Sequence, residues 1–335
     1  MAALRLVVPG NVIHRSGGNL YNSRLADALG GAGADVEIRR ADGDWPDAGS
    51  RARERLTILL QGSGPVLVDG LIASGAPDEI RAAVLAGRRI WVLVHMPVLD
   101  GEGLERRALE AATGVVCTSS DSAERLRTLY GLERIGVALP GTAAAAVATG
   151  SRPPRIVSVA ALLPNKNQDL LVRALSSVRD AEWTAELVGS TTADPGYVRT
   201  VRATLADHGL EGRVRLTGEL AGEELERHWA AADLSVLVSG TETFGLAVTE
   251  SLARGIPVLV RGGTGAVEAL GSGGGPALPG AAVELDEHPA PLAAVLRRWL
   301  EEEELRRSWR EAALAARTRL PGWDATARTV LELLS

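Results

Sequence analysis

Short apolar runs alternate with longer amphipathic segments along the 335-residue chain. Most of the runs are continuously apolar, which is what strands of a parallel sheet require when both faces of the sheet are covered. The segments between them repeat apolar residues at helical spacing; residues 19–31, for example, end at Gly30–Gly31, a helix stop signal. In the first half, strands are expected at 4–8, 35–38, 66–72, 90–96, 114–118 and 135–139.

A stretch rich in small residues, GTAAAAVATGSRPPR (141–155), interrupts this alternation and is typical of a linker. The alternation then restarts, with strands expected at 155–163, 183–189, 213–217, 234–239, 257–261 and 281–285. Helices fit between them at 167–178, 195–209, 222–232 and 245–254, and residues 291–320 and 324–335 are also helical in pattern. The pattern therefore predicts an α/β protein of two tandem doubly wound domains.

Composition narrows the function classes. Hydrophobic residues make up 46% of the chain, the mean hydropathy is +0.07 and the net charge is −6, which argues against a nucleic-acid partner. The single cysteine, Cys117, lies in an apolar run and excludes an internal disulfide framework and a cysteine-based zinc site. No signal peptide and no apolar stretch of membrane-spanning length is apparent, so we expect a cytoplasmic protein and leave peripheral membrane contact open.

Lys166 is the only lysine in the chain, whereas the other 35 of the 36 basic residues are arginines. It follows the first expected strand of the second domain and precedes a helix. Ligands bind beyond the carboxyl ends of parallel strands, and the N-terminus of a helix favours anions. A compact ammonium at this place is typical of a diphosphate site, although an exposed, solvated lysine would fit the same position.

A second cluster, ETFGLAVTE (242–250), contains two carboxylates eight residues apart. Glu242 follows an expected strand, and Glu250 lies within the helix that starts near Gly245. Two carboxylates so placed can accept hydrogen bonds from two parts of one ligand, while the amides of Phe244, Gly245 and Leu246 face its phosphates. The pair alone is a weak signal, because Glu250 would also suit a solvent-exposed helix face.

Four segments resemble, in order and over nearly the whole chain, the retaining glycosyltransferases of family 4. SGTETFGLAVTESLARGIPVLV (239–260) resembles their E-x7-E signature, and VSVAALLPNKNQDLLVRAL (157–175) resembles the segment that carries their phosphate-binding lysine. SGGNLYNSRLADALGGAGADVEI (16–38) and VVCTSSDSAERLRTLYGLERIGVALPG (115–141) resemble the opening and the end of their first domain.

This resemblance implies the GT-B fold, with two tandem Rossmann-like domains and a cleft between them. The first domain is expected at 1–150 and the nucleotide-sugar-binding domain at 151–317. LPGWDATARTVLELL (320–334) resembles the family's closing segment, so a C-terminal helix at 318–335 is expected to cross back to the first domain.

The resemblance also implies residue roles. Lys166 neutralises the donor diphosphate, Glu242 holds sugar hydroxyls near C3, and Glu250 binds the nucleotide ribose. His95 matches the family's histidine beside the reacting sugar, so His95, Lys166 and Glu242 form the expected catalytic set. The expected donor-binding residues are Gly17, Gly18, Lys166, Glu242, Phe244, Gly245, Leu246 and Glu250, with the two first glycines passing close under the diphosphate.

The implied activity is retaining, hexosyltransferase-type transfer from a UDP- or GDP-linked sugar to an acceptor hydroxyl or amine. No metal or resident cofactor is expected, because Lys166 and helix N-termini carry the leaving diphosphate's charge. The remaining histidines also lack metal-ligand spacing: His14, His208, His228 and His288. Acceptor contacts are expected from loops 11–23, 69–75 and 95–103, at Asn19, Asp69 and Met96, and their polarity favours a small polar acceptor.

One departure keeps alternatives open. The family usually has an arginine five residues before the lysine, where this chain has Ala161. A non-catalytic nucleotide-sugar-binding homologue therefore remains an alternative, and so does another GT-B enzyme, such as a sugar-nucleotide epimerase or a phosphorylase, although the E-x7-E match argues against both of these. The D-x-D sequence at Asp42–Asp44 is interpreted as a turn, and GSGGGP (271–276) lacks the lysine of a P-loop.

Overall fold

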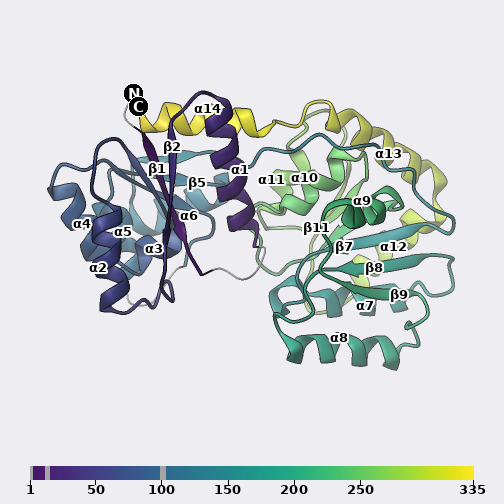
Figure 1. Ribbon diagram of the computed structural model, residues 1–335. Helices are drawn as coiled ribbons and strands as arrows, with labels where there is room; N and C mark the ends of the chain where they lie inside the picture. The colour runs from purple at the N-terminus through teal and green to yellow at the C-terminus, as the bar shows by residue number, and fades with distance from the viewer. Residues whose placement is uncertain (1–2, 12–15, 99–102) are drawn as a thin grey trace. The chain divides into compact units, whose positions relative to one another are not determined.

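The computed structural model describes residues 3–11, 16–98 and 103–335, and divides the chain into two compact units (Figure 1). Unit 1 runs to Gly141 and includes Pro321–Ser335; unit 2 is Thr142–Leu320. The boundary thus lies nine residues before the expected one at 150 (150 − 141). The small-residue stretch belongs to unit 2 because its backbone is hydrogen-bonded there: the Ala148 amide donates to the Arg254 carbonyl at 3.0 Å and the Thr149 amide to Ala230 at 2.8 Å.

Unit 1 is built on a six-stranded parallel sheet in the order β2-β1-β3-β4-β5-β6. Its strands are β1 (Leu4–Pro9), β2 (Val36–Ala41), β3 (Val66–Asp69), β4 (Ile90–Val94), β5 (Gly114–Cys117) and β6 (Ile135–Val137). Its helices are α1 (Gly17–Gly31), α2 (Ser50–Leu59), α3 (Gly70–Ser74), α4 (Pro77–Leu85), α5 (Leu104–Ala111), α6 (Ser120–Tyr130) and α14 (Trp323–Leu334). The strand order reverses between β1 and β3, so a ligand crevice is expected at their carboxyl ends.

Both faces of this sheet are buried along its inner strands, as the apolar runs predicted, whereas the edge strand β2 is largely exposed. Along β1, Leu4 and Leu6 contact the cluster that contains Tyr21 and Val330 of α1 and α14, whereas Val7 contacts the cluster on the other face. Helix α14, drawn in yellow in Figure 1, lies beside α1, and the Tyr21 ring meets the Trp323 ring edge-on at 5.3 Å. The last helix of the chain therefore completes the core of unit 1.

Unit 2 has a second six-stranded parallel sheet, in the order β12-β11-β10-β7-β8-β9. Its strands are β7 (Arg155–Val159), β8 (Thr184–Val188), β9 (Val214–Gly218), β10 (Leu234–Leu237), β11 (Val258–Arg261) and β12 (Gly280–Val283). Its helices are η1 (Pro164–Lys166), α7 (Gln168–Ser176), α8 (Pro195–Asp207), α9 (Gly222–Ala230), α10 (Leu246–Ala253), α11 (Ala266–Gly271), α12 (Ala290–Glu301) and α13 (Glu303–Arg317). The order reverses between β7 and β10, which makes their carboxyl ends the switch point of this sheet.

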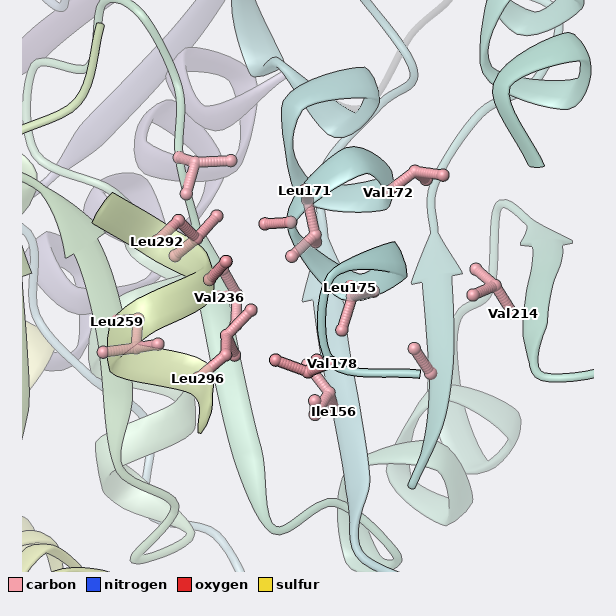
Figure 2. Packing of buried hydrophobic residues seen from close by; sticks show 14 of the residues in the cluster. Ile156, Leu171, Val172, Leu175, Val178, Val214, Val236, Leu259, Leu292 and Leu296 are labelled. Atoms are coloured by element: carbon pink, nitrogen blue, oxygen red, sulfur yellow. The ribbon is translucent and has the colours of Figure 1, made fainter. Parts of the chain in front are cut away.

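The core beneath this switch point is closely packed (Figure 2). Side chains from β7, β10 and β11 meet helices α7 and α12 in one apolar cluster, which includes Ile156, Val236, Leu259, Leu171 and Leu296. All five are fully buried, with 0% relative exposure. The loops that follow β7 and β10 are therefore carried by a rigid base.

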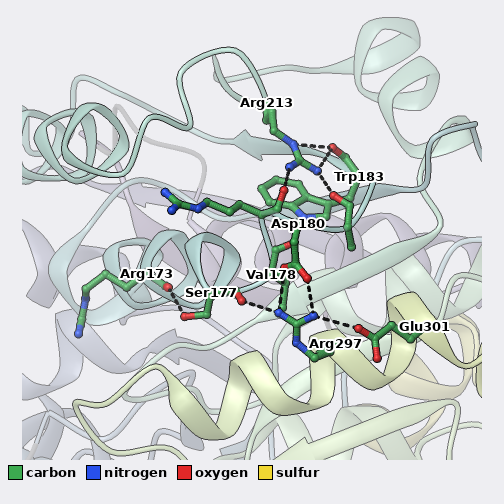
Figure 3. A network of polar contacts seen from close by, with 10 residues as sticks. Arg173, Ser177, Val178, Asp180, Trp183, Arg213, Arg297 and Glu301 are labelled. Carbon is green, nitrogen blue, oxygen red and sulfur yellow. Dashed lines mark hydrogen bonds and ion pairs between the residues drawn. The ribbon is translucent and has the colours of Figure 1, made fainter.

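Arginines tie backbone carbonyls together elsewhere in unit 2 (Figure 3). Just before β9, at the amino edge of the sheet, the guanidinium of Arg213 donates to the carbonyls of Trp183 and Ala181 and stacks over the Trp183 ring at 3.9 Å. Arg297 of α12 pairs with Asp180 and holds the pKa of that exposed carboxyl at about 2. These contacts show how the arginine-rich composition serves structure away from the carboxyl edge.

Within the described parts of the chain, no helix has the length and apolarity needed to cross a membrane.

Candidate functional site

The switch point of unit 2 brings Lys166 and Glu242 together. Lys166 follows β7 and Glu242 follows β10, and these two strands are neighbours in the sheet. The Lys166 Nζ atom donates to Glu242 Oε2 at 2.8 Å, and their side chains are 21% and 15% exposed. Residues separated by 76 positions in sequence thus form one half-buried ion pair at the sheet's carboxyl edge.

Lys166 is held by a short turn of chain. It ends the 3₁₀ helix η1, and Asn167 then adopts the left-handed conformation, with φ 54°, before α7 begins. The amide of Gly240 donates to the carbonyl of Asn165 at 2.6 Å, which ties this turn to the chain that leaves β10.

The loop carrying Glu242 is fixed from beneath. The Gly265 amide donates to the Glu242 carbonyl at 2.8 Å, and a Cβ on Gly265 would overlap the carbonyl of Thr243. Phe244 is only 3% exposed, so its ring anchors the loop in the core. Gly245, with φ +89°, then turns the chain into α10.

Two helix N-termini meet this edge of the sheet, and that of α7 is partly capped from α8, because the Asp169 amide donates to the Tyr197 hydroxyl at 3.1 Å. Neither α7 nor α10 has a side-chain hydrogen bond at its N-cap. The amides of a first helical turn lack partners within the helix and carry partial positive charge. Together with the ammonium of Lys166, they form an environment suited to a phosphate or diphosphate.

Buried polar atoms at the same edge also lack partners. Gln168, the first residue of α7, donates its amide to the Ala161 carbonyl at 2.9 Å, but its Oε1 atom has no hydrogen-bond partner among the described residues. The same holds for the hydroxyl of Ser239, which follows β10. Both side chains are 1% exposed. Orphaned buried polar groups are uncommon and mark places where a ligand or water completes the bonding.

Glu250 lies one turn into α10, about 6 Å along the axis from the helix start. It is half-buried, and its carbonyl accepts from Arg254 Nη1 at 2.6 Å. The predicted pair of glutamates therefore shares one loop and helix, with Glu242 beside Lys166 and Glu250 farther along.

Sequence reasoning missed Arg261, at the end of β11. Its Nε atom donates to the Val238 carbonyl at 3.2 Å and its Nη1 atom to the Leu285 carbonyl. With the Asn167 amide oriented so that both of its atoms are satisfied, the side-chain oxygen accepts from Arg261 Nη2 at 3.1 Å. No sequence signal pointed to this residue, because arginines are frequent throughout the chain.

In unit 1 the carboxyl ends of β3 and β4 bring Asp69 and His95 together with Asn22 of α1. The His95 Nε2 atom lies 3.0 Å from Asn22 Oδ1 and 3.4 Å from Asp69 Oδ2, and Asn22 also donates to Asp69 at 2.8 Å. Because two acceptors face Nε2, this nitrogen carries a ring proton. The sequence contains no signal for a role of Asn22, which the structure shows as a buried polar side chain, 4% exposed.

Asp69 is 3% exposed, and both of its carboxylate oxygens have partners, since Oδ1 accepts a hydrogen bond from the Leu71 amide at 3.0 Å. Burial raises the pKa of Asp69, but the hydrogen bond and charge of His95, with the Asn22 amide, outweigh burial and hold that pKa below its usual value. An ionised Asp69 behind His95 fits a residue that orients the imidazole better than one that contacts an acceptor directly.

The other residues expected on the acceptor side are more accessible. Met96 is 58% exposed, and Asn19 is half-buried in the first turn of α1. Gly17 and Gly18 open that helix, and a Cβ on Gly18 would lie 3.0 Å from His95 Cδ2, so the glycine makes room for the imidazole. Within the predicted loops 11–23 and 95–103, residues 12–15, with His14, and 99–102 lie outside the described residues.

No metal centre is assembled by the residues that the structure describes: none of their His, Cys, Asp and Glu side chains form a group of three or more able to hold an ion. Asp44, of the D-x-D sequence, is exposed, and its Oδ1 atom accepts a hydrogen bond from the side-chain nitrogen of Asn11 at 3.4 Å.

The comparisons with known proteins agree with this geometry. The family model of the glycosyl transferases group 1 matches residues 143–315, which is nearly all of unit 2. A D-inositol 3-phosphate glycosyltransferase of Kineococcus radiotolerans is 30% identical over 257 residues, 68% of this chain and 58% of that protein. A GDP-mannose-dependent phosphatidylinositol monomannoside mannosyltransferase of Mycobacterium tuberculosis is 34% identical over 124 residues, 35% of this chain and 32% of that protein. The chain thus spans about 58% of the length of the first of these relatives.

Solved structures share the fold over nearly the full chain. Sucrose-phosphate synthase of Thermosynechococcus elongatus has a TM-score of 0.77 at 20% identity, covering 99% of this chain and 98% of that one. Anabaena HepE, solved in complex with UDP and glucose, also has a TM-score of 0.77, at 17% identity, with 98% of each chain covered. These likenesses establish the two-domain GT-B fold. Since the family model covers more than half of the chain, the protein belongs to the glycosyl transferases group 1 family, as its resemblance to glycosyltransferase family 4 predicted.

Proposed function

We propose that this protein transfers a hexosyl group from a nucleoside-diphosphate sugar, UDP- or GDP-linked, to a hydroxyl or amine of a small polar acceptor, with retention of anomeric configuration. One observation carries the donor assignment: Lys166 Nζ and Glu242 Oε2 lie 2.8 Å apart at the switch point of unit 2. In a sugar nucleotide the anomeric carbon is bonded directly to a phosphate. A cation for the phosphate and a carboxylate for the sugar hydroxyls are therefore needed side by side.

The chemistry proposed for this site is stabilisation of the leaving diphosphate. Breaking the bond from the sugar to its phosphate places negative charge on the departing oxygen. Lys166 and the first-turn amides of α10 meet that charge without rearrangement, because both are fixed by the sheet beneath them. The backbone at Phe244, Gly245 and Leu246 lies at the N-terminus of α10 and supplies donors to the phosphates.

Glu250 is proposed to bind the ribose. A ribose follows the diphosphate on the side opposite the sugar, and Glu250 lies on α10 about 6 Å from its N-terminal amides. Glu242 and Glu250 would then contact the two ends of one donor.

Unit 1 is proposed to carry the acceptor side. His95 is held by Asn22 and Asp69, so its ring has a fixed orientation. Asn19 and Met96 are the proposed acceptor contacts, and Gly17–Gly18 let the backbone of α1 approach the diphosphate. Retention and the acceptor class rest on the family resemblance and on the polarity of the loops.

We further propose that transfer needs no metal ion, because Lys166 and the helix N-termini supply the positive charge. Turnover of the sugar nucleotide is then expected to persist in excess EDTA. Full loss on chelation, restored by magnesium or manganese, would show that an ion supplies charge at the diphosphate.

The assignment of Lys166 is tested by Lys166→Ala. Losing one charge-assisted contact to a phosphate costs about 1.5–3 kcal/mol, so donor-supported turnover should fall at least about tenfold while the melting temperature stays close to wild type. Release of the nucleoside diphosphate measures turnover. Unchanged kinetics together with unchanged affinity for UDP and GDP would rule the site out.

A non-catalytic nucleotide-sugar-binding protein is the second candidate, and Ala161 favours it, because its methyl group supplies no charge at that position. Such a protein would bind a sugar nucleotide in calorimetry but release no nucleoside diphosphate with any acceptor in a panel of polyols and amines.

A further inference from the structure

We propose that Arg261 is a positioning residue of the candidate donor site: its guanidinium holds Asn167 in a left-handed conformation and thereby sets the place of Lys166. This inference deepens the proposed function, since it concerns the diphosphate-binding half of the same site.

The first step concerns Asn167. Among the described residues it is the only non-glycine residue with a positive φ, at 54°. Asparagine tolerates this conformation better than most residues with a Cβ atom, but it is still less favourable than a negative φ, so contacts that stabilise it matter. Asn167 comes directly after Lys166 and directly before α7. A change in its backbone angles would therefore swing the Lys166 ammonium away from the N-terminus of that helix.

The second step concerns the contacts that hold Asn167 in this conformation. The Asn167 side-chain nitrogen donates to the Pro164 carbonyl at 3.1 Å, and its oxygen accepts from Arg261 Nη2 at 3.1 Å. The amide thus bridges the start of its own turn and the end of β11. A planar guanidinium with several donors is suited to such a bridge, whereas a lysine ammonium is not.

The third step concerns how Arg261 itself is fixed. Its Nε atom donates to the Val238 carbonyl at 3.2 Å, and its Nη1 atom binds the Leu285 carbonyl beyond β12. Two residues after Val238, the Gly240 amide donates to Asn165 at 2.6 Å. Arg261 and Gly240 therefore clamp the Lys166 turn to the chain that leads from β10 to Glu242.

A simpler role for Arg261 would be that of a second cation, attracting the diphosphate by charge alone. The two roles differ in their dependence on Asn167 and on the shape of the side chain. A positioning residue acts only through Asn167 and needs the guanidinium, whereas a charge acts without Asn167 and survives replacement by lysine.

The experiment measures binding by calorimetry with UDP and GDP, and with uridine and guanosine, for Arg261→Gln, Arg261→Lys, Asn167→Ala and the double variant Asn167→Ala/Arg261→Gln. Displacing Lys166 should be felt only by ligands that carry phosphate. Arg261→Gln and Arg261→Lys should each weaken binding of the preferred nucleoside diphosphate about tenfold and leave the nucleoside within about twofold. Asn167→Ala should lose a similar factor, because alanine lacks the bridging amide and disfavours a positive φ.

The decisive arm is the double variant. If Arg261 acts through Asn167, replacing Arg261 in the Asn167→Ala protein should change the affinity less than about twofold, because interacting residues are not additive. A further tenfold loss there, or normal binding by Arg261→Lys, would overturn the positioning role. Should Arg261→Gln fail to fold, Asn167→Ala still decides, since it leaves the bonds of Arg261 to Val238 and Leu285 in place; unchanged affinity of that variant would refute the proposal.

Two further variants distinguish a failure of the positioning role of Arg261 from a failure of the proposed function. Arg213→Gln removes another guanidinium that binds carbonyls in unit 2, at the amino edge of the sheet (Figure 3), and should lower the melting temperature without changing either affinity. Lys166→Ala tests the proposed function itself. If it leaves UDP and GDP binding unchanged, the proposed function fails; if it weakens binding but Arg261→Gln does not, only the positioning role fails.

Discussion

At the scale of single residues, the two glutamates of the E-x7-E segment should separate experimentally. Glu250 is proposed to contact only the nucleoside, so Glu250→Ala should weaken binding of the free nucleoside diphosphate by about tenfold. Glu242 is proposed to contact only the sugar, so Glu242→Ala should leave that affinity nearly unchanged and depress turnover of the intact donor. A substitution is felt only by ligands that present the contacted group.

Calorimetry with the nucleoside diphosphate and initial rates with the sugar nucleotide measure both effects. Identical behaviour of the two variants in both assays would contradict the assigned roles. Wild-type behaviour of both would remove the E-x7-E interpretation altogether.

The charged residues of the candidate donor site could be predicted from the sequence. The residues that hold the site residues in position could not. Lys166 is conspicuous as the only lysine, and Glu242 and Glu250 belong to a recognisable segment. Asn22 and Arg261 are ordinary residues until the fold brings them to His95 and Asn167. Their partners lie 73 and 94 residues away (95 − 22 and 261 − 167), and local spacing contains no information about such contacts.

At the scale of elements, Gly265 is the point where the Glu242 loop depends on close backbone approach. A Cβ at this position would overlap the Thr243 carbonyl, so Gly265→Ala must push the loop away from its place. We expect a loss of about 1–3 kcal/mol of folding free energy and a fall in turnover of at least about tenfold. Thermal unfolding and donor turnover measure the two effects.

The matched control is Gly271→Ala, at the other end of the same helix, α11. A Cβ there meets nothing within 4 Å, so this variant should keep wild-type stability and turnover. If the two alanine variants behaved alike, the close approach at Gly265 would have no importance for the loop.

Element types followed from the hydrophobic pattern, whereas several element ends did not. Each strand in the described parts of the chain overlaps one of the predicted apolar runs. The run 66–72, however, is a strand only to Asp69, because the Asp69 carboxylate caps the helix α3 that starts at Gly70. The stretch 142–150 has the small residues typical of a linker, yet it belongs to unit 2, where the amides of residues 148–150 are hydrogen-bonded.

At the scale of the whole molecule, unit 1 depends on residues from the far end of the chain. Ala327, Val330 and Leu334 of α14 are at most 3% exposed, in the cluster that contains Leu6 and Leu25. Burying a Val or Leu side chain stabilises by about 1.5–3 kcal/mol, against about 5–15 kcal/mol for a whole domain. A chain ending at Leu320 should therefore lose most of the stability of unit 1 and keep that of unit 2.

Hydrogen exchange followed by mass spectrometry tests this directly. In the truncated chain, amide protection in β1–β6 should fall towards that of an unfolded segment, while β7–β12 keep full-length values and serve as the internal control. Unchanged protection in β1–β6 would show that α14 contributes little to the core it covers.

The dependence of unit 1 on α14 also affects the order in which the two units can fold during synthesis. On the ribosome, 193 residues follow Gly141 before the last residue of α14 is made (334 − 141). At about 5–20 residues per second this takes about 10–40 seconds. Unit 2 is made during that interval and has all of its residues 14 positions before α14 is complete (334 − 320), whereas the apolar face of unit 1 waits for α14 throughout. The nascent chain should therefore acquire its proposed donor-binding half first and present an uncovered apolar surface to chaperones until synthesis of α14 is complete.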